Sequence, residues 1–106
     1  MKHKDEVMFR RWPEGEVIAL FPYIIATTTE GFVESYMHVG QHSGADLEII
    51  HCTKPANLSE SDTAMLYNEL TQIGYHLKVI KRVNWDRHIA EWNRARAMER
   101  YLLVTA

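Results

Sequence analysis

The sequence predicts an α+β fold: a two-layer sandwich in which a mainly antiparallel sheet of about five strands carries two helices on one face. Three observations predict this class. Apolar segments in the first half are joined by short stretches containing Pro, Gly, Asn and Asp, as in hairpins. Two later segments place apolar residues at helical spacing. The chain has 106 residues, 46% apolar and 25% charged, which predicts one globular domain over residues 1–106.

The first two strands form a predicted hairpin. Residues 7–12 are typical of a short strand, and residues 13–16 supply the Pro and Gly that a tight turn favours. Residues 17–21 are apolar at every position, which predicts a central strand with both faces buried. Pro22 cannot donate to a sheet, so the strand is expected to bend or end there.

The next segment, Phe32–His42, alternates between an apolar and a polar face and is the third predicted strand. Residues 43–46 are expected to turn the chain into a fourth strand, Leu47–Thr53, which is rich in Leu and Ile. The single cysteine, Cys52, lies inside that strand, and we expect it to be a buried small apolar residue.

A helix is predicted from about Glu60 to Ile73. Ser59 and Asp62 have the spacing of a capping box, although Asp is shorter than the usual Glu or Gln. Gly74 follows the last apolar position, where a helix C-terminus favours glycine.

The last third of the chain predicts a fifth strand and a second helix. Residues 75–83 alternate and carry lysines that favour a position at or near a sheet edge. Asn84 is a plausible helix N-cap, and the stretch from Trp85 to about Leu103 lacks Gly and Pro. The predicted order is therefore β-β-β-β-α-β-α.

Location is predicted from what the chain lacks. Its longest nearly uncharged run falls well short of the roughly 20 apolar residues that cross a bilayer. The first residues are charged and do not form the apolar core of a signal peptide. A single cysteine allows no internal disulfide, so a cytoplasmic protein is expected, without membrane association.

The polar face of the third strand is the first candidate site. With one face of the sheet covered by helices, the other is expected to be partly open, and Gly40 allows a ligand to approach closely. Replacing two of the site residues, Tyr36 and His38, by alanine should then abolish partner binding and change the melting temperature by only a few degrees. The candidate binding residues are Trp12, Tyr36, His38, Gln41 and His42.

Catalysis is the third hypothesis, as a small metal-dependent hydrolase using His38, His42 and His51. On a strand, however, His38 and His42 would lie about 13 Å apart, too far to share one metal ion. The chain has no Gly-x-Ser-x-Gly motif and no glycine-rich phosphate loop. We therefore expect a protein without enzymatic activity, bound metal or cofactor.

The C-terminal segment is basic and predicts an alternative nucleic-acid site. Residues 76–106 hold seven of the twelve Lys and Arg residues and three of the fourteen Asp and Glu residues. Trp85 and Trp92 could stack on bases, although at helical spacing they are also typical of a core. The candidate phosphate contacts are Lys78, Lys81, Arg82, Arg87, Arg94, Arg96 and Arg100.

A family resemblance adds context. The stretches Phe9–Trp12, Gly15–Pro22 and Ser35–His42, with looser likeness through Arg82, resemble a group of small bacteriophage and mobile-element proteins that has no established biochemical role. The resemblance implies an accessory protein acting inside a bacterial host. Our first hypothesis is accordingly a non-enzymatic binding module for a host protein or small ligand, and a homodimer that buries the histidine-bearing face is an alternative explanation of that face.

Overall fold

The structure is a computed structural model that describes residues 4–27, 31–37 and 41–105, and the side chains of all of these except 41, 42 and 103–105. The elements are β1 (Asp5–Arg11), β2 (Val17–Ile25), β3 (Phe32–Met37), β4 (Gln41–Asp46), the 3₁₀ helix η1 (Leu47–His51), β5 (Lys54–Pro55), α1 (Ser61–Ile73), β6 (Leu77–Val79) and α2 (Trp85–Thr105). The structure confirms the predicted α+β class, with a largely antiparallel sheet of six strands and two helices packed against it.

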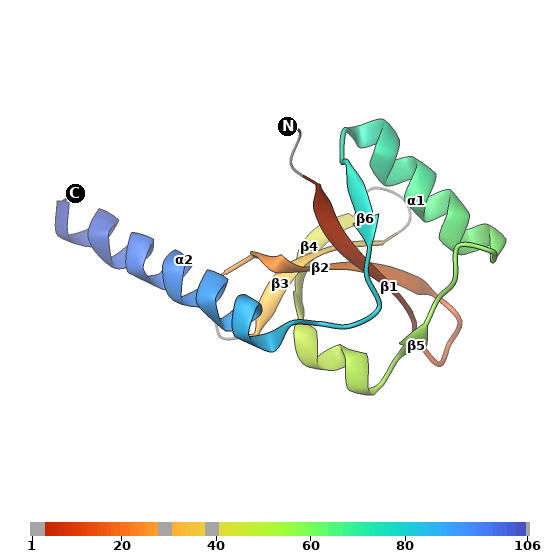
Figure 1. The fold of residues 1–106 in the computed structure, drawn as a ribbon, viewed down its shortest axis with the longest axis horizontal. Coiled ribbons are helices and arrows are strands. Elements are labelled where there is room, and N and C mark those ends of the chain that lie inside the picture. The colour runs from red at the N-terminus through yellow and green to blue at the C-terminus, as the bar shows by residue number, and fades with distance from the viewer. Residues whose placement is uncertain (1–3, 28–30, 38–40, 106) are drawn as a thin grey trace.

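The sheet has the strand order β4-β3-β2-β1-β5, and β6 also pairs with β1 (Figure 1). The pairs from β4 to β5 are antiparallel, whereas β6 runs parallel to the first residues of β1. Both β5 and β6 therefore lie along one edge of β1, at opposite ends of it. This confirms that the strand before α2 lies at a sheet edge, although it spans only Leu77–Val79 within the predicted segment 75–83.

The β1–β2 hairpin is closed as the sequence predicts. The Trp12 amide donates to the Glu16 carbonyl at 2.8 Å, and the Gly15 amide donates to the Trp12 carbonyl at 2.9 Å. Gly15 has φ of +106°, a backbone region that glycine enters without the steric cost of a side chain. Residues 17–21 are all buried, so the prediction of a central strand with two covered faces is also confirmed.

Each face of the sheet has its own apolar cluster. On one face, α1 buries Leu66 and Leu70 against alternate residues of β1 and β2, such as Phe9 and Phe21. The opposite face is covered by η1, through the fully buried Leu47, and by side chains of the segment before α2. The expectation that this second face is partly open is wrong, because the 3₁₀ helix and the segment 80–83 occupy it.

The chain after β3 differs from its predicted path. Residues 41–46 are a strand paired with β3, where a turn was predicted over 43–46, and residues 47–51 are a 3₁₀ helix where a fourth strand was predicted. Asp46 starts this helix, because its side chain accepts a hydrogen bond from the Glu48 amide at 2.9 Å. Cys52 ends it and is exposed, so its predicted burial is wrong.

The caps of the two helices follow their sequence signals only in part. Helix α1 begins after Glu60 without a side-chain cap, so the predicted capping box of Ser59 and Asp62 is not formed. Gly74 ends α1 with φ of +126°, as predicted. Asn84 caps α2 as predicted, because its side chain accepts a hydrogen bond from the Arg87 amide at 3.1 Å.

Helix α2 extends beyond the sheet (Figure 1). The sequence predicts both helices on one face of the sheet. Helix α1 covers one face, whereas α2 contacts the sheet only through its first turns, where His88 is buried beside β2. The radius of gyration is 14.5 Å, above the roughly 13 Å of a compact domain of this length. None of the helices in the described residues has the length and hydropathy of a membrane span.

Candidate functional site

The first predicted site is not assembled as an open surface. Tyr36 has 1% of its surface exposed and lies in the core beneath α1, and its hydroxyl donates to Glu69 of that helix at 2.6 Å. A buried tyrosine cannot contact a partner, so the expectation that Tyr36 lines an open face is wrong. The cause is the position of β3 beside the central strand, where α1 covers both.

The other members of that site are only partly described. Trp12 is half-buried and packs against the cluster on the second face of the sheet. Gln41 and His42 begin β4, but their side chains lie outside the described part of the structure, as does all of His38. A binding role for these three residues therefore stays a prediction.

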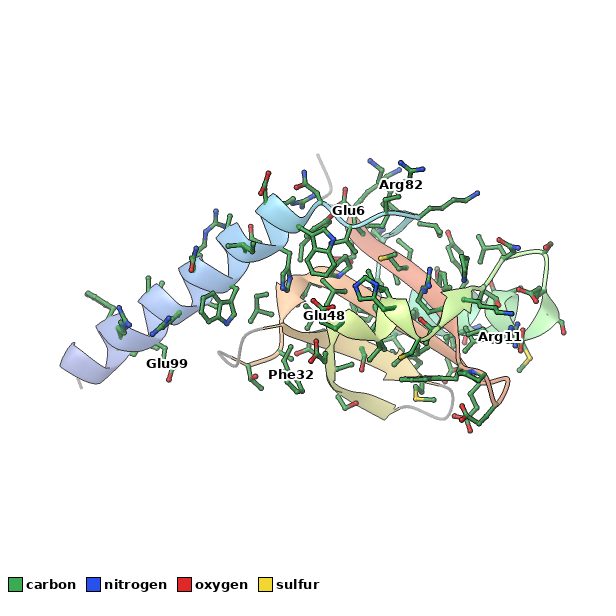
Figure 2. All side chains as sticks on the ribbon, turned by 90° about the horizontal axis from the view of Figure 1, so that it is seen from below. Glu6, Arg11, Phe32, Glu48, Arg82 and Glu99 are labelled. Carbon is green, nitrogen blue, oxygen red and sulfur yellow. The ribbon has the colours of Figure 1, made fainter. Side chains whose placement is uncertain are left out.

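The predicted phosphate contacts separate into three groups. Carboxylates already pair with three of them: Glu6 with Lys78 and Arg87, and Glu91 with Arg94. On α2, Arg96 stacks on Trp92, with its guanidinium carbon 5.3 Å from the ring centroid, and Arg100 is exposed. The two that remain, Lys81 and Arg82, lie on the segment before α2 and line a basic cleft. Figure 2 labels Arg82 on this segment.

This basic cleft has a volume of about 330 Å³ and lies between η1, β1 and the start of α2. Among the described residues that line it, four side chains are cationic or can become so, and none is a carboxylate. It is lined by Met8, Arg10, Ile50, His51, Lys81, Arg82, Val83 and Trp85. A concave site with this composition fits an anion and at least one aromatic or apolar group.

Arg10 lines the basic cleft, and hydrogen bonds hold its guanidinium in place. Its Nε donates to the Thr53 hydroxyl at 3.0 Å, and its Nη2 donates to the Ile50 and Thr53 carbonyls at 2.7 and 2.5 Å. The Thr53 hydroxyl is oriented in turn, because it donates to the Ile49 carbonyl at 2.8 Å. These bonds hold the guanidinium in one position, so the Arg10 side chain loses less conformational entropy when a ligand binds.

No carboxylate of the described residues forms an ion pair with Arg10. Burial lowers the pKa of Arg10 from its ordinary value, because desolvation disfavours the charged form. The group nevertheless stays protonated at neutral pH, since an arginine pKa lies far above 7. The hydrogen-bond partners of Arg10 among the described residues are all neutral, so an anion in the basic cleft would supply an opposite charge that Arg10 lacks there.

Trp85 forms the wall between the basic cleft and a second cavity. This second cavity, of about 410 Å³, is lined by Gly31, Asp46, Glu48, Trp85, His88, Ile89 and Trp92. The ring of Trp85 is held by an edge contact with His88, at 5.8 Å between centroids. His88 is 4% exposed and is fixed by its own bond, in which Nδ1 donates to the Pro22 carbonyl at 2.9 Å.

Two carboxylates, Asp46 and Glu48, line the second cavity, and Glu48 also contacts a residue of the basic cleft. Glu48 lines the second cavity and pairs with His51 of the basic cleft, at 3.1 Å between Oε2 and Nε2 (Figure 2 shows Glu48 on η1). Both side chains are more than 60% exposed, so solvent screens this pair strongly. Glu48 therefore offers a hydrogen-bond acceptor in the cavity that Trp85 also lines, while the described lining of the basic cleft is cationic.

Metal binding has no support in the described residues, where no group of three or more His, Cys, Asp and Glu side chains could hold an ion. His51 pairs with Glu48, and His38 lies outside the described residues, so the proposed histidine hydrolase site is not assembled there.

Arg10 was not among the site residues predicted from the sequence. A signal was present: Arg10 falls between Met8 and Trp12 on one face of β1, and Met8 is buried. A charged residue at an inward position of a half-apolar strand is uncommon and needs partners. Those partners come from residues 49–53, which the sequence predicted as a strand, so their carbonyls could not be placed beside Arg10.

Comparisons of the chain with protein-family models, with curated proteins and with solved structures found no match.

Proposed function

We propose that this protein is a binding module for single-stranded nucleic acid, with the phosphates in the basic cleft and a base on Trp85. The observation that carries the proposal is Arg10, an anchored cation that lines that cleft and has no carboxylate partner among the described residues. Lys81 and Arg82 add two further cations, and Trp85 adds the aromatic surface. Basic grooves with neighbouring aromatic side chains are the usual means of holding single strands.

The arrangement favours a single strand over a duplex. Trp85 lies between the two cavities, so a base can stack on it only when that base is not already stacked and paired within a double helix. The Glu48 carboxylate in the second cavity can accept a hydrogen bond from an exocyclic amine of the same base. The cleft volume of about 330 Å³ suits one phosphate-sugar unit and not a double helix.

The proposal replaces the first sequence hypothesis with its alternative. Burial of Tyr36 removes a central member of the predicted protein-binding face. Binding of a host protein through Trp12, His38, Gln41 and His42 stays a separate prediction, as does an origin in a phage or mobile element.

The proposal is tested by fluorescence anisotropy with a labelled single-stranded oligonucleotide, titrated at several salt concentrations. Three cationic contacts predict a slope of log affinity against log salt of about −2, because each contact on a single strand contributes about −0.7. A duplex of the same sequence should bind at least about 10-fold more weakly. A flat salt dependence, or equal affinity for the duplex, would contradict the assignment.

Matched charge reversals locate the contact. Arg82→Glu should weaken binding by about 10-fold or more and lower the salt slope by about 0.7. Arg100→Glu makes the same charge change on the outer part of α2, outside both cavities, and should change affinity by less than about 2-fold. Equal losses in the two variants would mean that overall charge, and not the cleft, governs binding.

Two substitutions of Trp85 test the aromatic surface of the proposed site. Trp85→Ala should weaken binding by roughly 5- to 150-fold, as expected for the loss of one base stack. Trp85→Phe keeps an aromatic face and should recover most of that loss. Circular dichroism of each variant establishes that the fold is retained.

A further inference from the structure

The second cavity differs in charge from the basic cleft with which it shares Trp85. Among the described residues that line it, Asp46 and Glu48 are carboxylates, and none is Lys or Arg. Most of the remaining lining is aromatic or apolar and comes from Trp85, Ile89 and Trp92. A ligand that combines a flat apolar ring with hydrogen-bond donors is therefore complementary to this cavity.

His88 adds a further acceptor from the buried side of the second cavity. Its Nδ1 donates to the Pro22 carbonyl at 2.9 Å, so Nε2 of the neutral ring is an acceptor. His88 is 4% exposed, and none of the described residues donates a hydrogen bond to Nε2. No sealed side-chain nitrogen or oxygen of the described residues lacks a partner, so Nε2 is open to the cavity that His88 lines. A buried acceptor of this kind indicates a ligand that donates a hydrogen bond.

The two carboxylates keep capacity for further hydrogen bonds. Asp46 accepts the Glu48 amide through Oδ1, and Glu48 pairs with His51 through Oε2. An ionised carboxylate has about four acceptor positions, so each of the two can still accept donors from a ligand. The described ionisable groups of the second cavity thus all present acceptors.

Among the nucleic-acid bases, guanine matches these acceptors. Its N1–H and 2-amino groups are adjacent donors on one edge, and the two oxygens of a carboxylate can accept from both at once. Adenine and cytosine present an amino group beside an acceptor nitrogen, whereas thymine presents one N–H between two carbonyls. A carboxylate facing any of these three bases would therefore meet an acceptor, and an unpaired acceptor lowers affinity.

We propose that the second cavity is a guanine-selective subsite of the single-strand site, an inference that rests on the proposed function. The base stacks on Trp85, and its N1–H and 2-amino groups donate to Glu48. Nε2 of His88 is the further acceptor for the 2-amino group, and the charge of Asp46 disfavours bases that present carbonyls. The cavity volume of about 410 Å³ accommodates a purine.

Fluorescence anisotropy with short single strands tests this selectivity. The strands are all-thymine, or carry one guanine or one inosine at the centre. The guanine strand should bind about 5- to 150-fold more tightly than the all-thymine strand, as expected for one bidentate base contact. Inosine lacks the 2-amino group, so its strand should bind about 10-fold more weakly than the guanine strand. Equal binding of the guanine and inosine strands would overturn the assigned contact.

Substitutions in the second cavity locate the selectivity. Glu48→Gln leaves one acceptor in place of two and should reduce the preference for guanine over thymine to below about 3-fold, without weakening the all-thymine strand. Glu14→Gln makes the same change on the exposed β1–β2 turn and should leave the preference unchanged. A preference that survives Glu48→Gln would overturn the role of Glu48.

His88→Asn tests the buried acceptor. The Asn amide keeps a donor for the Pro22 carbonyl, but the acceptor at Nε2 is lost, so the preference for guanine should fall while the all-thymine strand binds as before. Circular dichroism establishes that the variant is folded. An unchanged preference in the folded variant would overturn the contact with His88.

The same titrations separate this inference from the proposed function. Equal affinity for all three strands, with a salt slope of about −2, would overturn the guanine subsite and leave single-strand binding intact. Failure of every strand to bind would contradict single-strand binding itself, and the subsite with it. Arg82→Glu should weaken all strands alike and keep the preference for guanine, because Arg82 lines the basic cleft and not the second cavity.

Discussion

Replacing Tyr36 by alanine tests whether the face of the sheet that carries it is buried or open. Truncation to alanine removes a ring that is 1% exposed and a hydrogen bond to Glu69 of 2.6 Å. Removing a buried aromatic side chain costs about 3–5 kcal/mol in the free energy of unfolding. For a chain of this size, that loss lowers the melting temperature by at least about 12 °C.

Tyr36→Phe isolates the hydrogen bond. It keeps the ring but leaves Glu69 without this donor, and a hydrogen bond to a charged group contributes about 1.5–3 kcal/mol. We therefore expect Tyr36→Phe to be destabilised by less than Tyr36→Ala but by more than about 1 kcal/mol.

The assay is urea unfolding followed by circular dichroism, with Tyr101→Ala as the matched control. Tyr101 is 63% exposed on α2, so its truncation should change the free energy of unfolding by less than about 0.5 kcal/mol. If Tyr36→Ala is as stable as that control, α1 does not cover β3, and the open face predicted from the sequence would be correct.

Three further predictions concern pH, capping and thiol reactivity. The Arg11 guanidinium forms two hydrogen bonds with Asp62, at 2.7 and 2.8 Å, and lowers the pKa of that carboxyl from 3.8 to about 2. This pair stabilises the fold above pH 4 and loses its effect as pH falls from about 4 to 2, so in acid unfolding Asp62→Asn should show a flatter pH dependence over that range. Asn84→Ala removes the acceptor for the Arg87 amide and should cost about 1 kcal/mol in chemical denaturation; an unchanged midpoint would contradict the cap. Cys52 is exposed, so a thiol reagent such as Ellman's should modify it in the native protein at a rate that denaturant hardly raises; protection in the native state would contradict this exposure.

The sequence predicts the fold class because its strongest signals are local. The β1–β2 hairpin, the buried run over 17–21 and the cap at Asn84 each depend on residues close together in the chain, and the structure confirms all three. The prediction of a strand over 47–53 is wrong because a short apolar run does not distinguish a strand from a buried helical turn. The sequence predicts Asp46 as part of a turn, whereas in the structure its side chain caps the 3₁₀ helix η1.

The candidate site was harder to predict because its parts are far apart in sequence. Arg10 meets Thr53 across 43 positions, and Lys81 and Arg82 join them from the segment before α2. Charge alone predicted a basic site along the segment 75–83 and the helix that follows, but pairing with Glu6 and Glu91 neutralises part of that surface. Pairing of this kind depends on tertiary packing, which charge counts along a sequence do not contain.

The central claim is that the basic cleft binds a single strand, and two-dimensional ¹H–¹⁵N NMR of the labelled protein tests it most directly. On titration with a short single-stranded oligonucleotide, we expect the largest shift changes at residues 50–53 and 81–85, together with the Trp85 indole, which line or adjoin the cleft. Signals of residues 94–102 should change little. Changes concentrated in the outer part of α2 or at the β3–β4 hairpin, or the absence of any change, would contradict the account.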